Sequence, residues 1–342
     1  MAVDIPVHEI DLAPFRAGDA ADRAAVAEAF DRAGRDSGFI LLTGHGVDSA
    51  VVDDAFAAWQ AFFDLPVEQK LRSVAAPESE GLTGYIAYGE QALAYTAGGT
   101  SPPDLMEAYS VGREDTTDPF FDAYRDWFPA NVWPDHPPEL RAASDALELA
   151  LQDVADAVLR AMALALDLPE RWLVQRAERA VVTRTCNRYL RGAGFEPLPD
   201  QPGLGGHTDY GMMTLLVADP VPGLQVLRGG EWHDVVPPRG SIVCNLGDML
   251  AMWTNDRWVS TMHRVLPPSP DDGVTRRRSI ARFLDGDPSM TIDAIPSCVE
   301  PGAVPRYPPV QAGEWLMAKI VGGQKAQPVD LHEGGLTGAT NR

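Results

Sequence analysis

The first part of the chain has apolar residues at helical spacing. The pattern predicts a helix over residues 22–37, whose buried face carries Val26, Ala29, Phe30 and Ala33. Similar apolar stripes predict helices over Val51–Phe63 and over Pro138–Asp167, where Pro169 prevents a longer helix. Between the first two helices, the apolar run Phe39–Gly46 predicts a short buried strand.

After about residue 180 the pattern changes from helical stripes to short runs rich in β-branched residues. Glycine, proline and aspartate separate these runs, and their spacing is typical of an antiparallel sandwich or jelly roll. The predicted strand-forming runs cover residues 181–190, 212–219, 223–236, 240–254, 257–266 and 276–285. We therefore expect an α+β protein whose β-rich core follows a mainly helical first half.

Composition limits where such a protein works and what it binds. A chain of 342 residues with 45% hydrophobic and 23% charged residues is an ordinary globular protein with a large core. Cys186, Cys244 and Cys298 are far apart, which indicates a reducing compartment, so we expect a cytoplasmic protein. The N-terminal segment has no secretory signal pattern, and no apolar run is long enough to span a membrane. The net charge of −21 argues against nucleic acid and anionic membranes as partners.

Two histidines and one aspartate are the strongest candidates for chemistry. His207 and Asp209 are two residues apart, so an extended chain places their side chains on one face. His263 lies in another strand-like run and supplies a third ligand. Two histidines and one carboxylate on one side of a β-sandwich form the facial triad of non-haem iron(II) oxygenases, which leaves coordination positions open for substrate and O₂.

The run at residues 276–285 adds a site for an anion. A hairpin folded about residue 270 would place Arg277 opposite His263, so that Arg277 and Ser279 point into the cavity beside the metal. A buried arginine needs an anionic partner, and a dicarboxylate co-substrate supplies one. Arg276 and Arg278 fall on the other strand face, where we expect a solvated basic surface.

The run at residues 181–190 repeats this alternation. Asn187 and Tyr189 lie on one face, from which they can orient the same ligand. Arg184 lies on the opposite face, where a structural role is the simpler expectation. If Arg184 lines the pocket instead, it favours an anionic substrate.

With these motifs in place, the chain resembles the isopenicillin N synthase-like family of 2-oxoglutarate- and iron(II)-dependent oxygenases. The resemblance rests on "IPVHEIDL", "DSGFILLTGHGV" and "AFFDLPVEQKLRS" near the N-terminus, and on HTD at His207–Asp209, HRV at His263–Val265, the RxS element at Arg277–Ser279 and N-x-Y at Asn187–Tyr189. The segment between HRV and RxS is longer than the family pattern and carries "PPSPDDG".

The resemblance implies a double-stranded β-helix wrapped by N-terminal and C-terminal helices. Residues 1–342 would form one catalytic unit, with a leader region at 1–125, a long helical segment at 126–179, the oxygenase core at 180–290 and a C-terminal extension at 291–342. His207, Asp209 and His263 would bind iron(II). Arg277 and Ser279 would hold the distal carboxylate of 2-oxoglutarate, with Tyr189 assisting and Asn187 nearby.

The function that the resemblance implies is oxidation of a C–H bond in a small molecule of secondary metabolism. O₂ and 2-oxoglutarate are consumed, succinate and CO₂ are released, and the outcome is hydroxylation, desaturation or ring closure. For substrate contacts we single out Tyr85, Tyr88 and Tyr95 in a glycine-punctuated segment, together with Arg184. Packing of the leader region on the core is the competing interpretation for the tyrosines.

Three other functions use the same residues. An oxidase of the isopenicillin N synthase type would keep the triad and work without 2-oxoglutarate. A zinc hydrolase would use His207, Asp209 and His263 without O₂, although the sequence offers no candidate general base. A non-catalytic binding protein would be expected to have lost part of the triad or Arg277, and both are intact.

Overall fold

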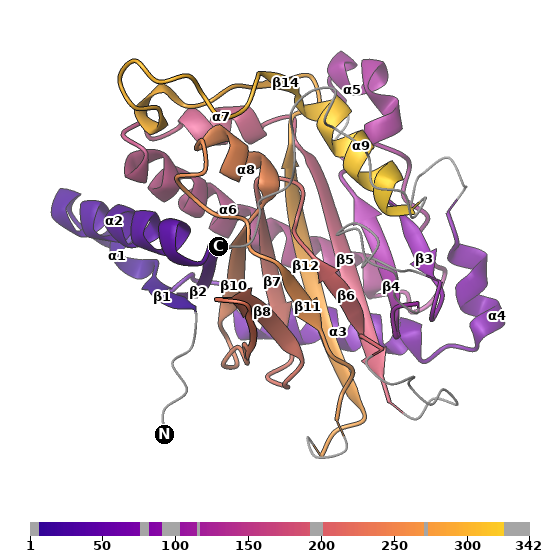
Figure 1. Cartoon of the computed structure of the whole chain (residues 1–342). Helices are drawn as coiled ribbons and strands as arrows, with labels where there is room; N and C mark the ends of the chain where they lie inside the picture. The colour runs from indigo at the N-terminus through magenta and orange to yellow at the C-terminus, as the bar shows by residue number, and fades with distance from the viewer. Residues whose placement is uncertain are drawn as a thin grey trace.

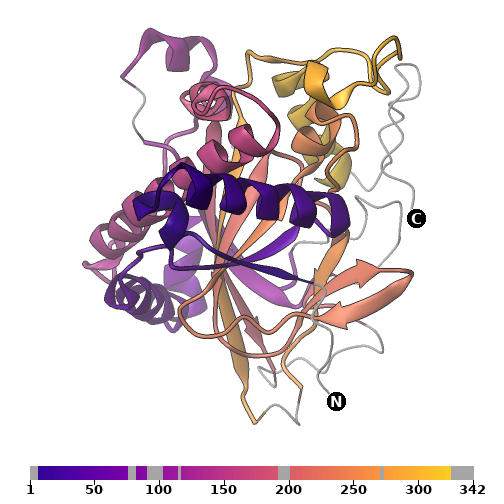
Figure 2. The same cartoon turned by 90° about the vertical axis from the view of Figure 1, so that its left-hand side faces the viewer.

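Two β-sheets form the centre of the molecule, and helices cover the outer face of the larger sheet (Figure 1). The computed structural model describes residues 7–75, 82–90, 103–114, 117–191, 201–269 and 273–324, the side chains of 321–324 excepted. Figure 2 views the same arrangement from the side, with the smaller sheet on the edge away from the long helices. The fold is α+β with a double-stranded β-helix core, as the sequence predicts.

The three helices that the hydrophobic pattern predicts are present to within a few residues. They are α2 (Ala20–Asp36), α3 (Ser49–Phe63) and α6 (Leu140–Ala165). Helix α2 begins at a capping box, in which the Asp19 and Asp22 carboxylates each accept the backbone N–H of the other residue. The remaining helices are α1 (Ala13–Ala17), α4 (Val67–Lys70), α5 (Pro119–Ala123), α7 (Trp172–Ala177), α8 (Asp248–Trp253) and α9 (Ala312–Gln324).

The larger sheet has eight strands in the order β1-β2-β10-β7-β12-β5-β4-β3. These are β1 (His8–Asp11), β2 (Phe39–Thr43), β10 (Ile242–Leu246), β7 (Met213–Ala218), β12 (Arg276–Gly286), β5 (Val181–Leu190), β4 (Met106–Gly112) and β3 (Gly84–Ile86). The smaller sheet has the order β6-β11-β8-β9, with β6 (Leu204–His207), β11 (His263–Val265), β8 (Leu224–Arg228) and β9 (Glu231–Asp234). A two-stranded pair, β13 (Thr291–Ile292) and β14 (Val310–Gln311), precedes α9.

The larger sheet buries both of its faces, so it separates two apolar clusters. On the outer face, Cys186 and Ile280 pack in one cluster with the apolar stripe of α6 and with α3. On the inner face, Tyr189 and Val243 pack with Val226 of the smaller sheet. Each side chain of β5 and β12 therefore points either toward the helices or into the space between the two sheets.

Two sequence expectations about the core differ from the structure. Residues 248–253 form helix α8 instead of continuing a strand, because the N–H groups of Gly247, Asp248 and Met249 bond to carbonyls in the turn at residues 209–212. In the run at 257–266, strand structure is confined to His263–Val265. The leader region also supplies strands β1, β3 and β4, beside the predicted β2. Within the described ranges, no helix is both long and apolar enough to cross a membrane.

Candidate metal centre and co-substrate pocket

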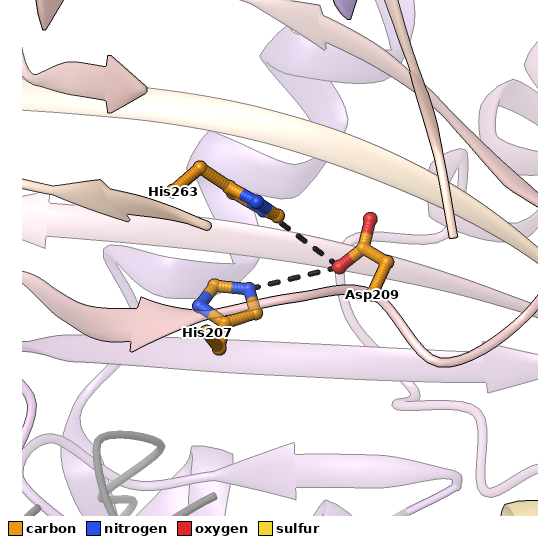
Figure 3. Close-up of side chains that lie close together, drawn as sticks. All are labelled: His207, Asp209 and His263. Atoms are coloured by element: carbon orange, nitrogen blue, oxygen red, sulfur yellow. Dashed lines mark ion pairs between the residues drawn. The ribbon is translucent and has the colours of Figure 1, made fainter. Parts of the chain in front are cut away.

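Three candidate metal ligands converge at the end of strand β6. His207 is the last residue of β6, Asp209 follows in the turn toward β7, and His263 begins β11 directly opposite His207. Nε2 of each histidine lies 3.7 Å from Oδ1 of Asp209, as Figure 3 shows. One ligand atom from each residue lies within 4.8 Å of the others, and all three residues are buried. The sequence prediction that these residues meet is therefore confirmed.

Backbone carbonyls fix the orientation of both imidazole rings. Nδ1 of His207 lies 2.7 Å from the Gly205 carbonyl, and Nδ1 of His263 lies 3.1 Å from the Thr261 carbonyl. Because a carbonyl only accepts, each Nδ1 carries the proton and each Nε2 keeps a lone pair for a metal. The edge of Phe39 packs against the His263 ring, with 5.3 Å between the ring centroids.

Two donors hold the other oxygen of the Asp209 carboxylate. Asn245 Nδ2 donates to Oδ2 at 2.6 Å, and the hydroxyl of Thr214 donates to the same oxygen. Oδ1 is thereby left facing the two histidines. Sequence reasoning missed both donors. Asn245 lies on β10 and reaches Asp209 because β10 pairs with β7, whereas Thr214 lies on β7 itself, five residues after Asp209.

The protonation states suit a divalent metal. Burial and the neighbouring His263 lower the pKa of His207 to about 4, so this imidazole is neutral at physiological pH. Burial opposes ionisation of Asp209, but the two histidines and the donors Thr214 and Asn245 outweigh it and lower the pKa of the carboxyl. Two neutral imidazole nitrogens and one carboxylate oxygen are the donor set of a non-haem iron(II) site, so these residues fit iron.

Arg277 lies fully buried on the inner face of β12, and its charge has no hydrogen-bonded partner in the described part of the chain. Nε, Nη1 and Nη2 have no hydrogen-bond acceptor among the residues that the structure describes. The guanidinium carbon lies 5.4 Å from the centre of the Tyr189 ring, and Tyr189 is the cross-strand neighbour of Arg277. Burial lowers the pKa of Arg277. A buried guanidinium without a protein acceptor fits the carboxylate of a ligand.

Asn187 and Ser279 form the next cross-strand pair along β5 and β12. Both side chains are buried, and Oδ1 of Asn187 has no donor among the described residues. Tyr189 is also buried, which raises the pKa of its hydroxyl to about 12, so the group remains a neutral donor. The four residues predicted to hold the co-substrate therefore lie together on adjoining positions of two strands.

The predicted hairpin between His263 and Arg277 is wrong. β11 pairs with β6 and β8 in the smaller sheet, whereas β12 pairs with β5 and β7 in the larger one. The proline-rich connection crosses from one sheet to the other instead of turning back in the same sheet. Arg277 still faces the interior, because the alternation along β12 is independent of which strand lies beside it.

The expectation of a solvated basic surface fails for Arg278. Arg276 is exposed, but Arg278 is partly buried, and its Nε and Nη2 donate to the two carboxylate oxygens of Asp219 at 3.0 Å each. The Arg278 side chain also packs over the Phe56 ring of α3. The outer face of β12 therefore belongs to the interface with the helices.

The residues singled out for substrate contacts bond to other parts of the protein where the structure describes them. The Tyr85 hydroxyl donates to Glu107, and its ring packs edge-on against Phe62 of α3. Arg184 donates to the Ser144 carbonyl of α6 at 2.6 Å. Both side chains turn toward the helices, and these contacts favour the packing interpretation of Tyr85 and the structural role expected for Arg184. Tyr88 donates to the Leu190 carbonyl, and Tyr95 lies outside the described residues.

Asp285, near the end of β12, is a carboxylate close to the candidate metal centre that sequence reasoning missed. A Cβ at Gly211 would collide with its Oδ1, so the carboxylate adjoins the turn that carries Asp209. Burial and the nearby Asp209 raise the pKa of Asp285 to about 7. Its position at the end of the Arg277, Ser279, Phe283 alternation was the available signal.

Two family models match the chain. Residues 5–136 match the model described as non-haem dioxygenase in morphine synthesis N-terminal, and residues 181–286 match the 2OG-Fe(II) oxygenase superfamily. Among curated proteins, the chain is 35% identical to "Validamycin A dioxygenase" of Streptomyces hygroscopicus subsp. limoneus, over 94% of this chain and 87% of that protein. It is 31% identical to "Homoarginine-6-hydroxylase 2-ODD-233" of Oryza sativa subsp. japonica, over 88% and 90% of the two chains.

Solved structures that bind alpha-KG or are described as 2OG-Fe(II) oxygenases also resemble this chain. A full-length Neurospora crassa protein in complex with alpha-KG superimposes with a TM-score of 0.79 at 27% identity, covering 94% of this chain and 98% of that chain. A putative 2OG-Fe(II) oxygenase family protein from Caulobacter crescentus gives a TM-score of 0.78 at 29% identity, covering 93% and 99%. Both matches cover more than nine-tenths of each chain.

Proposed function

The chain belongs to the isopenicillin N synthase-like family of 2-oxoglutarate- and iron(II)-dependent oxygenases, and from that premise we propose which of its residues carry the reaction. The enzyme is a non-haem dioxygenase that uses iron(II), 2-oxoglutarate and O₂. His207, Asp209 and His263 hold the iron in our proposal. The observation that carries it is the convergence of two Nε2 atoms on one carboxylate oxygen.

Arg277 is proposed to bind the distal carboxylate of 2-oxoglutarate, with Ser279 and Tyr189 beside it and Asn187 close by. Its guanidinium is fully buried without an acceptor among the described residues, which supports this role. A carboxylate that accepts two parallel hydrogen bonds from the guanidinium would offset the desolvation of Arg277 and position the other end of 2-oxoglutarate.

When bound, iron(II) and 2-oxoglutarate supply O₂ activation, so that a substrate C–H bond is oxidised while succinate and CO₂ are formed. The protein residues position and protect that chemistry. The Gly205 and Thr261 carbonyls keep Nε2 of both histidines available. Asn245 and Thr214 keep Oδ1 of Asp209 aimed at the metal. The apolar inner cluster, which includes Phe39 and Val226, keeps bulk water from the centre.

The substrate is proposed to be a small molecule. The relatives differ in what they are named for, validamycin A in one case and homoarginine in another, so they support the substrate's size and not its identity. The net charge of −21 supports our proposal that nucleic acid is not a partner. The free cysteines Cys186, Cys244 and Cys298 support a cytoplasmic location, which fractionation of the native host would test.

The ligand assignment is tested by His207→Ala and Asp209→Ala, with His233→Ala as the control histidine on strand β9. Anaerobic titration with iron(II) should show binding by wild type and by the control, and none by either ligand variant. Succinate release in the presence of substrate should follow the same order. Iron binding at the wild-type level in a ligand variant would contradict the assignment.

A further inference from the structure

Asp285 lies at an irregular position near the end of strand β12, where the pairing with β5 shifts. Against β5, Leu284 pairs with Val182 and Gly286 with Val181, so Asp285 is the extra residue of a β-bulge. Bulges re-aim a side chain and often lie beside active sites. Leu284 packs in the outer cluster with the helices, and the Asp285 carboxylate adjoins Gly211 in the turn that carries Asp209.

Along strand β12, Asp285 lies close to the candidate metal centre. Phe283, two residues before it, lies opposite Thr214 in the pairing of β12 with β7. Thr214 donates to the carboxylate of Asp209. Asp285 thus lies about one residue pair beyond the metal ligands, at the end of the strand away from Arg277.

The Asp285 carboxylate has no hydrogen bond and no ion pair with any residue that the structure describes. This contrasts with Asp209, whose carboxylate accepts from Asn245 and Thr214. Asp285 is partly buried, and its burial and the neighbouring Asp209 disfavour the ionised form, as its raised pKa shows. A half-buried carboxylate without a protein partner is available to pair with a ligand.

No side chain within the described ranges forms an ion pair with Asp285. Lys319 of α9, which lies against the Tyr210 ring, already pairs with Asp248 at 3.1 Å. In the loaded enzyme, Asp209 would offset part of the iron charge and Arg277 part of the 2-oxoglutarate charge. When ionised, Asp285 would keep its negative charge, and its Oδ1 packs closely against Gly211, where a Cβ would collide with it.

We propose that Asp285 binds a cationic nitrogen of the substrate, a protonated amine or a guanidinium, and so orients the substrate beside the metal centre. This inference rests on the proposed function, since it places the substrate over the His207, Asp209 and His263 ligands. A cation is favoured over a neutral hydroxyl because it supplies hydrogen-bond donors and also cancels the charge of a half-buried carboxylate.

The test uses the full chain loaded anaerobically with iron(II) and 2-oxoglutarate. The probes are pairs of equal shape that differ in charge: L-homoarginine and L-homocitrulline, agmatine and N-carbamoylputrescine, cyclohexylamine and cyclohexanol. Binding is measured by calorimetry and by the change in the visible iron-to-2-oxoglutarate absorption. At least one cationic probe should bind about tenfold or more tightly than its neutral partner.

Asp285→Asn should abolish the preference for the cation, and Asp293→Asn, which removes the same charge from an exposed position, should retain it. Equal binding of neutral partners, a preference that survives in Asp285→Asn, or no binding of any cationic probe would overturn the proposal. Iron and 2-oxoglutarate binding is measured first, without a probe. Failure at that step contradicts the proposed function, whereas failure limited to the probes contradicts only the role of Asp285.

Discussion

The arginines on the two faces of strands β5 and β12 differ in whether the protein supplies their hydrogen-bond acceptors. On the outer face, Arg278 pairs with both oxygens of Asp219, and Arg188 donates to Glu107 at 2.7 Å and to Asp64 at 2.6 Å. On the inner face, Arg277 is more deeply buried than either and has no acceptor among the described residues. The outer arginines attach the helices to the sheet, whereas we propose that the inner one binds a ligand.

The presence or absence of a protein counter-charge distinguishes structural arginines from candidate ligand-binding arginines more clearly than burial does. Arg184, Arg188, Arg277 and Arg282 are all buried, so exposure alone does not distinguish them. What differs is whether the protein itself supplies the counter-charge. A buried charge that the fold leaves unpaired destabilises the folded state, so its retention indicates a ligand.

The largest effect is expected for Arg277→Met. Removing the guanidinium should weaken 2-oxoglutarate binding by about 100-fold or more, because a buried charge pair with the ligand is lost. The unfolding free energy of the ligand-free protein should not fall, since no protein partner is left unpaired. Anaerobic titration and urea unfolding measure the two quantities, with the exposed Arg276→Met as control. Unchanged 2-oxoglutarate affinity would remove Arg277 from its role.

The same substitution on the outer face should have the reverse outcome. Arg188→Met is expected to lower the unfolding free energy by about 2–3 kcal/mol, because Glu107 loses one of its partners and keeps Lys70 and Tyr85. The folded variant should bind 2-oxoglutarate with wild-type affinity. If Arg188→Met weakened 2-oxoglutarate binding as much as Arg277→Met, the distinction between the two faces would fail.

Asn245→Ala and Thr214→Val test the hydrogen bonds that orient Asp209. Each variant should weaken iron(II) binding by about tenfold, within the 10–100-fold range expected for partners that hold a metal ligand. Binding is measured by anaerobic metal titration, and circular dichroism checks the fold. Wild-type affinity in both variants would mean that Asp209 needs neither donor to present Oδ1.

A stability effect is also expected for Asp285 in the metal-free protein. Its pKa of about 7 lies above the ordinary value of 3.8, so its contribution to stability is full below about pH 4 and is lost as the pH rises through 7. Asp285→Asn should therefore be more stable than wild type by about 2 kcal/mol at pH 8, a value reduced for partial solvent access. Urea unfolding at pH 8 and pH 4 measures the difference, which should vanish at the lower pH. Equal stability at pH 8 would mean that the ionised carboxylate is well solvated.

The sequence by itself determined the features that depend on local periodicity and short spacing. The stripes of α2, α3 and α6 predicted those helices, because burial of one helix face recurs every three to four residues. The two-residue spacing of His207 and Asp209 and the alternation of Arg277 and Ser279 predicted which side chains share a face, since successive residues of a strand alternate.

Only the tertiary structure decided which groups meet across the chain. It placed His263 opposite His207 instead of Arg277, because the connection before β12 changes sheets. It also brought Asp219 to Arg278 and Asn245 to Asp209, and left Arg277 and Asp285 without partners among the described residues. Strand alternation is a local property of the backbone, whereas a counter-charge comes from wherever the sheets and helices pack.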